Sequence, residues 1–143
     1  MPPDIELSYY SDQLFDPPAP AVMVELRSPD YPNSADPERL VGLLDSGAFI
    51  SAIPETVIEK LHLHKIDEIE AGDYNAEEEK DFRTVPVYWI HLTVPYLEPI
   101  WARVIPKKPK SHATVGRNVI NDWLLTLDGP KLKAYLKSIT EIT

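Results

Sequence analysis

Asp45, Ser46 and Gly47 follow directly on the apolar run Arg39–Leu44, and they are the residues with the clearest potential for chemistry. A short apolar run bounded by turn residues is typical of a buried strand, so the chain brings a carboxylate to the end of such a strand. Asp-Ser-Gly is also a common turn sequence, because Asp and Ser bond back to the backbone and Gly accepts positive φ. The triplet alone leaves two interpretations open, an ordinary turn or a functional carboxylate.

The surroundings of the triplet favour the second interpretation. It is followed by Ala48 and a second apolar run, and Gly116-Arg117-Asn118 follows another short apolar run farther along the chain. In this arrangement the sequence resembles the retropepsin-like aspartic proteases, the single-domain group of retroviral proteases and their bacterial relatives. The resemblance spans about Ala21 to Leu136, and the residues that carry it are Leu43–Ala48, Ser51, Ile53, Pro54 and Val115–Ile120, with Trp123–Pro130 similar to the bacterial branch.

Composition agrees with the fold that this resemblance implies. The chain has 143 residues, enough for one domain with a real core, and its 15 prolines between short apolar runs favour a β-rich fold. The resemblance implies an all-β, closed retropepsin-like barrel with one or two short helices, functional as a C2 homodimer. We expect this domain over residues 21–143, after a Pro-rich N-terminal arm, residues 1–20, that is disordered unless it packs on something.

Apolar patterning and turn residues predict where the elements lie. Pro54–Leu61 is expected to be a short helix, because Pro suits the first helical turn and Lys60 lies near the end. Lys65–Arg83 is strongly acidic and is expected to be a protruding hairpin or loop. The expected strands are Ala21–Arg27, Arg39–Leu44, Phe49–Ile53, Val85–Val94, Ile100–Ile105 and Ala113–Val115, followed by one or two helical turns in Asn118–Trp123 and a terminal hairpin of Leu124–Leu127 and Leu132–Leu136. The side chains expected in the core are Trp89, Trp101, Trp123 and His91.

The resemblance implies a definite reaction, the hydrolysis of peptide bonds by an aspartic endopeptidase. Two carboxylates a few ångströms apart cannot both ionise, so they share one proton. The ionised oxygen activates a water as general base, and the protonated oxygen polarises the scissile carbonyl. Asp128-Gly129 lacks the middle hydroxyl, so this chain has a single Asp-Ser-Gly. The second aspartate must then come from a second copy, through a two-fold axis.

The resemblance also implies a role for each motif residue. Asp45 is expected to be the catalytic acid and base. The expected supports of its loop are Ser46, whose hydroxyl would bond the partner loop, Gly47, which allows close approach, and Ala48, which keeps the wall of the site small. Gly116, Arg117 and Asn118 are expected to brace this loop structurally.

Two departures from the family pattern concern the surroundings of the site. Retroviral relatives usually have an acid directly after Gly-Ala that pairs with the arginine of Gly-Arg, whereas Phe49 stands there in this chain, so the partner of Arg117 is open. The family's flap is often glycine-rich at its tip, and here Gly72 is the only glycine of the candidate flap. Tyr74 could cover the site from this segment.

Composition excludes several other classes of function. The net charge of −9 argues against nucleic acid as a partner, and the small basic cluster Lys107, Lys108 and Lys110 is interpreted as a solvated loop. The chain has no cysteine and no long apolar run, so we expect no membrane span and a cytoplasmic location. His62 and His64 lack a third ligand in the sequence, and neither a metal nor another cofactor is expected.

Two alternatives from other classes stay open at the level of sequence. The first is a catalytically weak retropepsin-like dimer that acts as a peptide-binding or protein-binding module. The atypical sequence of the candidate flap favours this alternative. The second is an unrelated β-barrel interaction module in which Asp-Ser-Gly is a chance turn. The expected partners under the main hypothesis are a second copy of the chain and a peptide or protein substrate.

Overall fold

The computed structural model describes residues 5–11, 15–72 and 82–138, and this part of the chain is mostly β. Its strands are β1 (Ile5–Ser8), β2 (Ala21–Arg27), β3 (Glu38–Leu44), β4 (Ser51–Pro54), β5 (Lys65–Gly72), β6 (Phe82–Thr93), β7 (Ile100–Lys107), β8 (Ala113–Val115), β9 (Trp123–Asp128) and β10 (Lys133–Ser138). Two short helices complete the fold, α1 (Glu55–Lys60) and α2 (Arg117–Ile120). The expected strands and helices therefore occur in the expected order, with ends that move by a few residues.

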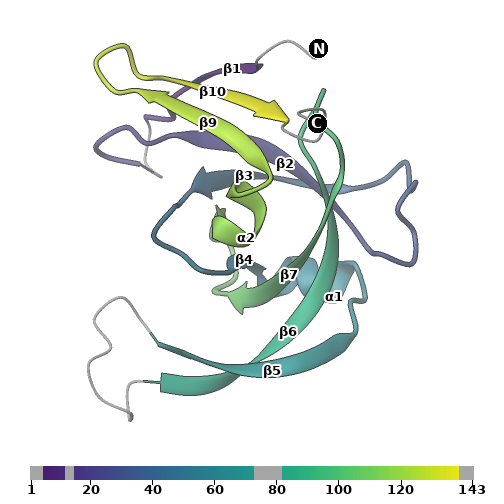
Figure 1. Ribbon diagram of the computed structural model, residues 1–143. Coiled ribbons are helices and arrows are strands. Elements are labelled where there is room, and N and C mark those ends of the chain that lie inside the picture. Colours follow the sequence, from purple (N-terminus) through teal and green to yellow (C-terminus); the bar gives the residue numbers. More distant parts are fainter. Residues whose placement is uncertain (1–4, 12–14, 73–81, 139–143) are drawn as a thin grey trace.

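A seven-stranded sheet in the order β2-β3-β8-β4-β7-β6-β5 forms most of the molecule (Figure 1). β2 pairs with β6 as well as with β3, so the pairings run in a ring from β2 through β3, β8, β4, β7 and β6 back to β2. β3 pairs with β8 in parallel, and so does β4 with β7. The other strand pairs of this sheet, including β8 with β4, are antiparallel. β5 lies outside this ring and pairs with β6.

Successive side chains of a strand point to opposite faces of the sheet, so about every second side chain lies in the core. In β2 the buried residues are Val22, Val24 and Leu26, and each is at most 2% exposed. Such side chains each stabilise the fold by about 1.5–3 kcal/mol relative to exposure to water. The other strands of the ring contribute in the same way, with Leu44, Ile53, Ile90, Val104 and Val115 among the buried residues.

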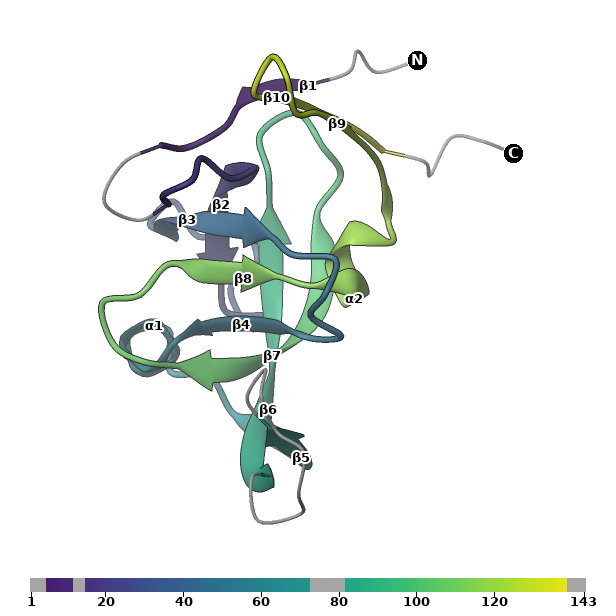
Figure 2. The same ribbon diagram turned by 90° about the vertical axis from the view of Figure 1, so that its left-hand side faces the viewer.

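A three-stranded sheet, β1-β10-β9, lies apart from the ring, at the top of Figures 1 and 2. β9 and β10 form the predicted terminal hairpin, in which Tyr135 pairs with Thr126. β1 adds to the other side of β10, with Leu7 opposite Ala134. The described part of the N-terminal arm is thus held by backbone pairing and by the buried Phe15, which is 8% exposed. The division into an arm and a domain stays a prediction.

The expectation that all three tryptophans lie in the core is wrong for two of them. Trp123 is 7% exposed, but Trp89 is 42% exposed and Trp101 is 52% exposed. Trp101 lies opposite His91 across the β6–β7 pair, and the two rings make an edge-to-face contact at 4.9 Å. His91 is 6% exposed, as predicted for a core residue, and the outward-facing Trp101 ring packs against it. Its buried Nδ1 has no hydrogen-bond partner among the described residues, so the expectation of a satisfied histidine is wrong.

The described ends of the acidic segment pair as two antiparallel strands, which favours the hairpin among the two predicted alternatives. β5 and β6 pair in antiparallel register from Lys65 opposite Tyr88 to Gly72 opposite Phe82. Gly72 is thus the last residue of β5. Tyr74, the other candidate flap residue, lies outside the described residues.

Candidate active site

β3 delivers Asp45 to the edge of the sheet, between β2 and β8. The Asp45 amide donates to the carbonyl of Val115 at 2.9 Å, and the Leu44 amide donates to the carbonyl of Pro20 at 3.0 Å. Backbone bonds from both sides therefore fix where the strand ends. The Asp45 side chain is half-buried, and Ser46 and Gly47 after it are exposed.

The loop after β3 is a tight turn built on the Asp45 carboxylate. The Gly47 amide donates to Asp45 Oδ1 at 2.8 Å, and the Ala48 amide donates to the Asp45 carbonyl at 3.2 Å. The side chain is therefore held in one orientation by its own loop, as Asp does in many turns. A Cβ at Gly47 would lie 3.1 Å from Asp45 Oδ1, so a larger residue at this position would crowd the carboxylate. One carboxylate oxygen is engaged with the loop in the described part of the chain.

Arg117 braces the same loop through backbone carbonyls. Its guanidinium Nη1 donates to the Ser46 carbonyl at 2.9 Å, and its amide donates to the Ala48 carbonyl at 2.8 Å. This answers the question raised by Phe49, which stands where an acid was expected and is 55% exposed. The loop supplies carbonyl oxygens to Arg117 in place of a carboxylate. Figure 2 shows this loop, between β3 and β4, beside α2.

Asn118 ties α2 to two strands of the sheet. Its Oδ1 accepts from the Ser51 amide at 2.9 Å and from the Ser51 hydroxyl at 2.8 Å. Its Nδ2 donates to the Arg103 carbonyl at 2.8 Å. Ser51, which is 1% exposed, passes the network on because its Oγ accepts from the Gly116 amide at 2.9 Å. Such a satisfied buried network holds its members in one arrangement.

Gly116 is required by close packing of two backbone segments. A Cβ at this position would lie 2.8 Å from the Ile50 carbonyl carbon and 2.9 Å from the carbonyl oxygens of both Ile50 and Ala48. Any side chain would push the Asp45 loop away from α2. The structure thus brings together Asp45, Ser46, Gly47, Ala48, Gly116, Arg117 and Asn118, all predicted from the sequence, and it places Gly72 separately at the end of β5.

Lys107 is a charged neighbour of Asp45 that sequence reasoning missed. The interpretation of Lys107, Lys108 and Lys110 as one solvated loop is wrong for Lys107, which ends β7, is half-buried and donates from Nζ to Thr114 Oγ1 at 2.9 Å. Burial lowers the pKa of Lys107, and the nearby Asp45 carboxylate raises it. The predicted strand ended at Ile105, whereas β7 runs two residues farther and includes Lys107.

The remaining histidines lie elsewhere. His112 packs its ring against Phe15 at 4.9 Å, and burial followed by the charge of Lys107 lowers the pKa of His112. His62 and His64 line a cavity of about 470 Å³, and His64 Nε2 lies 3.6 Å from Asp30 Oδ2. Among residues 5–11, 15–72 and 82–138, no group of three or more His, Cys, Asp or Glu side chains could hold a metal ion.

A second cavity is separate from the Asp45 loop. It measures about 590 Å³, is mainly apolar, and is lined by residues of β1, the start of β2 and the β6–β7 connection, such as Leu7, Met23 and Tyr96. Asp45 does not line it. No helix in the described part of the chain is both long and apolar enough to cross a membrane.

Comparison with solved structures identifies the architecture. No protein-family model matches the chain, and no curated protein matches it in sequence. The crystal structure of a retropepsin-like aspartic protease from Rickettsia conorii is similar, with a TM-score of 0.60 and 11% identity over 94% of this chain and 89% of that chain. The solution structure of the simian foamy virus (mac) protease has a TM-score of 0.50 and 17% identity over 71% of this chain and 92% of that one. The chain has the retropepsin-like fold.

Proposed function

We propose that this protein is an aspartic endopeptidase whose active site forms in a C2 homodimer of closed barrels, with one Asp45 from each copy. The observation that carries the proposal is the bracing of the Asp45 loop. Arg117 holds the Ser46 and Ala48 carbonyls, and Gly116 allows α2 to approach the loop closely. An ordinary surface turn needs no such support from a distant segment.

The proposed chemistry needs only the paired carboxylates and water. Two Asp45 side chains across a two-fold axis would share a proton, because two negative charges a few ångströms apart repel each other strongly. The ionised carboxylate takes a proton from the attacking water. The protonated carboxyl donates to the carbonyl oxygen of the scissile bond, and the amine leaves after it receives a proton. No covalent intermediate and no metal ion take part in this scheme.

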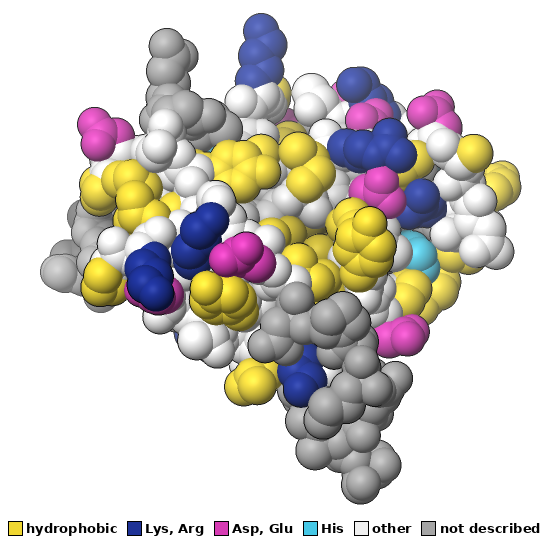
Figure 3. All heavy atoms as spheres, turned by 90° about the horizontal axis from the view of Figure 1, so that it is seen from above, with side chains coloured by type: hydrophobic (Ala, Val, Ile, Leu, Met, Phe, Trp, Pro, Cys, Tyr) yellow, Lys and Arg dark blue, Asp and Glu magenta, His cyan; other side chains and the backbone are white. Residues whose placement is uncertain are grey.

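The surface of the described chain supports an association of two copies. β9 pairs only with β10 among the described residues, so one edge of this strand is open to further pairing. Leu124 and Leu127 on β9 are 54% and 52% exposed, and Phe49 beside the Asp45 loop is also exposed. Figure 3 shows hydrophobic side chains interspersed with charged ones on the face seen from above. Exposed apolar groups next to an open strand edge favour a protein contact.

The exposed residues of the Asp45 loop are proposed to contact the second copy. Ser46 and Gly47 are exposed, and the Ser46 hydroxyl is proposed to bond the second copy. Gly72 and Tyr74 are proposed to belong to a flap on the β5–β6 hairpin. The substrate is proposed to be a peptide or protein.

The test replaces the carboxylate and keeps the turn. In Asp45→Asn the amide oxygen can still accept from the Gly47 amide, so the dimer should persist by sedimentation while cleavage of a peptide library from pH 3 to 8 disappears. Asp128→Asn is the matched control, because Asp128 Oδ1 likewise accepts a backbone amide, that of Lys131, at 3.1 Å. Unchanged cleavage by Asp45→Asn removes Asp45 from the mechanism, and a strictly monomeric wild type refutes the shared dyad. Peptide binding without any cleavage by the wild type would favour the binding module.

A further inference from the structure

We propose that Lys107 makes this site selective for peptides that carry an acidic side chain close to the scissile bond. The inference rests on the proposed function, since it names the substrate class of that site. Lys107 would act as a specificity-determining cation that attracts Glu or Asp of the substrate and repels Lys or Arg. Three features lead to this assignment. They are the face of the sheet from which Lys107 projects, the lack of a carboxylate partner for its ammonium group among the described residues, and the different environment of the neighbouring lysines.

Strand alternation shows which face carries the site. Ala113 and Val115 of β8 are 2% and 1% exposed and lie in the core, so Thr114 between them faces the other side of the sheet. Leu43 pairs with Thr114 across the β3–β8 ladder and shares its face. Asp45 is two residues beyond Leu43 and therefore leaves β3 on the same side.

The same face continues to Lys107 through β4 and β7. Ala52 pairs with Thr114 on one side and with Ile105 on the other, so these residues form a row across neighbouring strands. Lys107 is two residues beyond Ile105 and projects from the same face. Its Nζ then reaches back to Thr114 Oγ1, at 2.9 Å. The ammonium group is thus held above β8, the strand directly beside the one that carries Asp45.

The charge of Lys107 is available to a ligand. In the described part of the chain no carboxylate lies within ion-pair distance of its Nζ. Burial lowers the pKa of Lys107, and the charge of the nearby Asp45 opposes this shift without reversing it. An ammonium group has three donors, and one of them is directed to Thr114. The neighbouring His112 has a lowered pKa and is neutral at pH 7, so Lys107 supplies the positive charge here.

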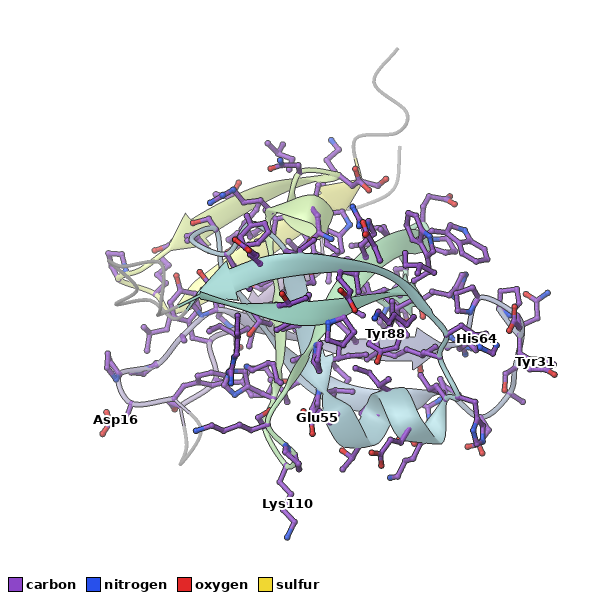
Figure 4. The ribbon with its side chains drawn as sticks, turned by 90° about the horizontal axis from the view of Figure 1, so that it is seen from below. Asp16, Tyr31, Glu55, His64, Tyr88 and Lys110 are labelled. Atoms are coloured by element: carbon purple, nitrogen blue, oxygen red, sulfur yellow. The ribbon has the colours of Figure 1, made fainter. Side chains whose placement is uncertain are left out.

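The two lysines of the loop after β7 are more exposed than Lys107. Lys108 and Lys110 are exposed, and Figure 4 shows the Lys110 side chain directed away from the protein. Lys107 is half-buried on the face of Asp45. A peptide bound across that face would pass close to this ammonium. In a C2 dimer each copy would contribute one such group, giving one acidic preference on each side of the scissile bond.

The experiment compares matched peptides that differ only by Glu or Gln, placed in turn at each of the three positions on either side of the cleaved bond. At pH 6 a peptide Glu is ionised, since its pKa is about 4.3. For the wild type we expect kcat/KM to favour Glu about fivefold to tenfold at one position on each side, the range of a charge-assisted bond at a half-exposed site. Lys107→Met should reduce the ratio to below about twofold, whereas Lys107→Arg and the control Lys110→Met should keep it.

The outcomes separate this inference from the proposed function. Cleavage by the wild type with no Glu preference, or a preference that persists in Lys107→Met, overturns the role of Lys107 and leaves the endopeptidase intact. A shifted pH–rate profile with an unchanged Glu-to-Gln ratio means that Lys107 acts on Asp45 only, which also overturns it. Binding of the same peptides to Asp45→Asn, followed by fluorescence anisotropy, measures the preference without catalysis. An absence of cleavage together with a Glu preference in binding refutes the endopeptidase and keeps the role of Lys107.

Discussion

Replacing Gly116 by alanine tests the close approach between α2 and the Asp45 loop. The added Cβ would lie 2.8 and 2.9 Å from the carbonyl carbon and oxygen of Ile50 and 2.9 Å from the Ala48 oxygen. All three are backbone atoms, which cannot rotate away as a flexible side chain can. The φ of −90° at Gly116 is accessible to alanine, so in the folded state the substitution adds the clash and no backbone strain.

The expected magnitude follows from two opposing terms. Overpacking of this kind costs about 1–3 kcal/mol, and contact with three backbone atoms places Gly116→Ala near the upper end. Alanine also restricts the unfolded chain, which stabilises the fold by about 0.4–1 kcal/mol. We therefore expect a net loss of about 2 kcal/mol in the free energy of unfolding, or a Tm lower by roughly 8 °C for a chain of this size.

Gly129→Ala is the matched control, because a Cβ at Gly129 meets no atom within 4 Å. We expect its free energy of unfolding to stay within about 0.5 kcal/mol of the wild type. Urea unfolding is measured at one fixed protein concentration, because the stability of a dimer depends on concentration. Equal urea midpoints and equal m-values for the two variants would show that the loop and α2 are not in tight contact.

Three further predictions concern the surroundings of the site. Asn118→Ala should cost about 2–3 kcal/mol of unfolding free energy in urea, since it leaves the buried Ser51 groups without their acceptor; a loss below 0.5 kcal/mol would refute this. Arg117→Met should change the Tm by less than 3 °C, because the guanidinium is exposed, yet lower kcat/KM severalfold by freeing the Ser46 carbonyl. Burial lowers the pKa of His91 below 6.5, so the unfolded chain gains the proton first and stability falls as the pH drops through about 6.5. His91→Phe should therefore show a shallower loss of stability between pH 7 and 5, and an equal slope would contradict the assignment.

The order of elements could be predicted because most strands bury one face. Alternating or continuous apolar runs identify β2, β3, β7 and β8 with little error in their ends. The seven residues of the two motifs were also found together in space, as the resemblance implied. The N-terminal strand was not predicted, because its pairing with β10 depends on residues at the far end of the chain.

Other features could not be predicted because they depend on tertiary contacts. Arg117 was left without a partner, since backbone carbonyls carry no sequence signal and only the fold shows that Ser46 supplies one. Trp101 was expected in the core because it falls in a predicted strand, yet it covers His91 from the outer face of β7. Lys107 resembled a loop residue next to Lys108, and its bond to Thr114 depends on the order of the strands in the sheet.

The two parallel pairs explain why these groups meet. Parallel strands end at the same edge, so pairing β3 with β8 brings Asp45 beside Val115 and places Gly116 and α2 next to the Asp45 loop. β4 and β7 run in the opposite direction, so the end of β7 lies toward the other edge. β4 lies between β7 and β8, and the flexible four-carbon stem of Lys107 carries its ammonium group across β4 to Thr114. The strand order that brings the two motifs together is thus the same feature that places the Lys107 ammonium above β8, beside the strand that carries Asp45.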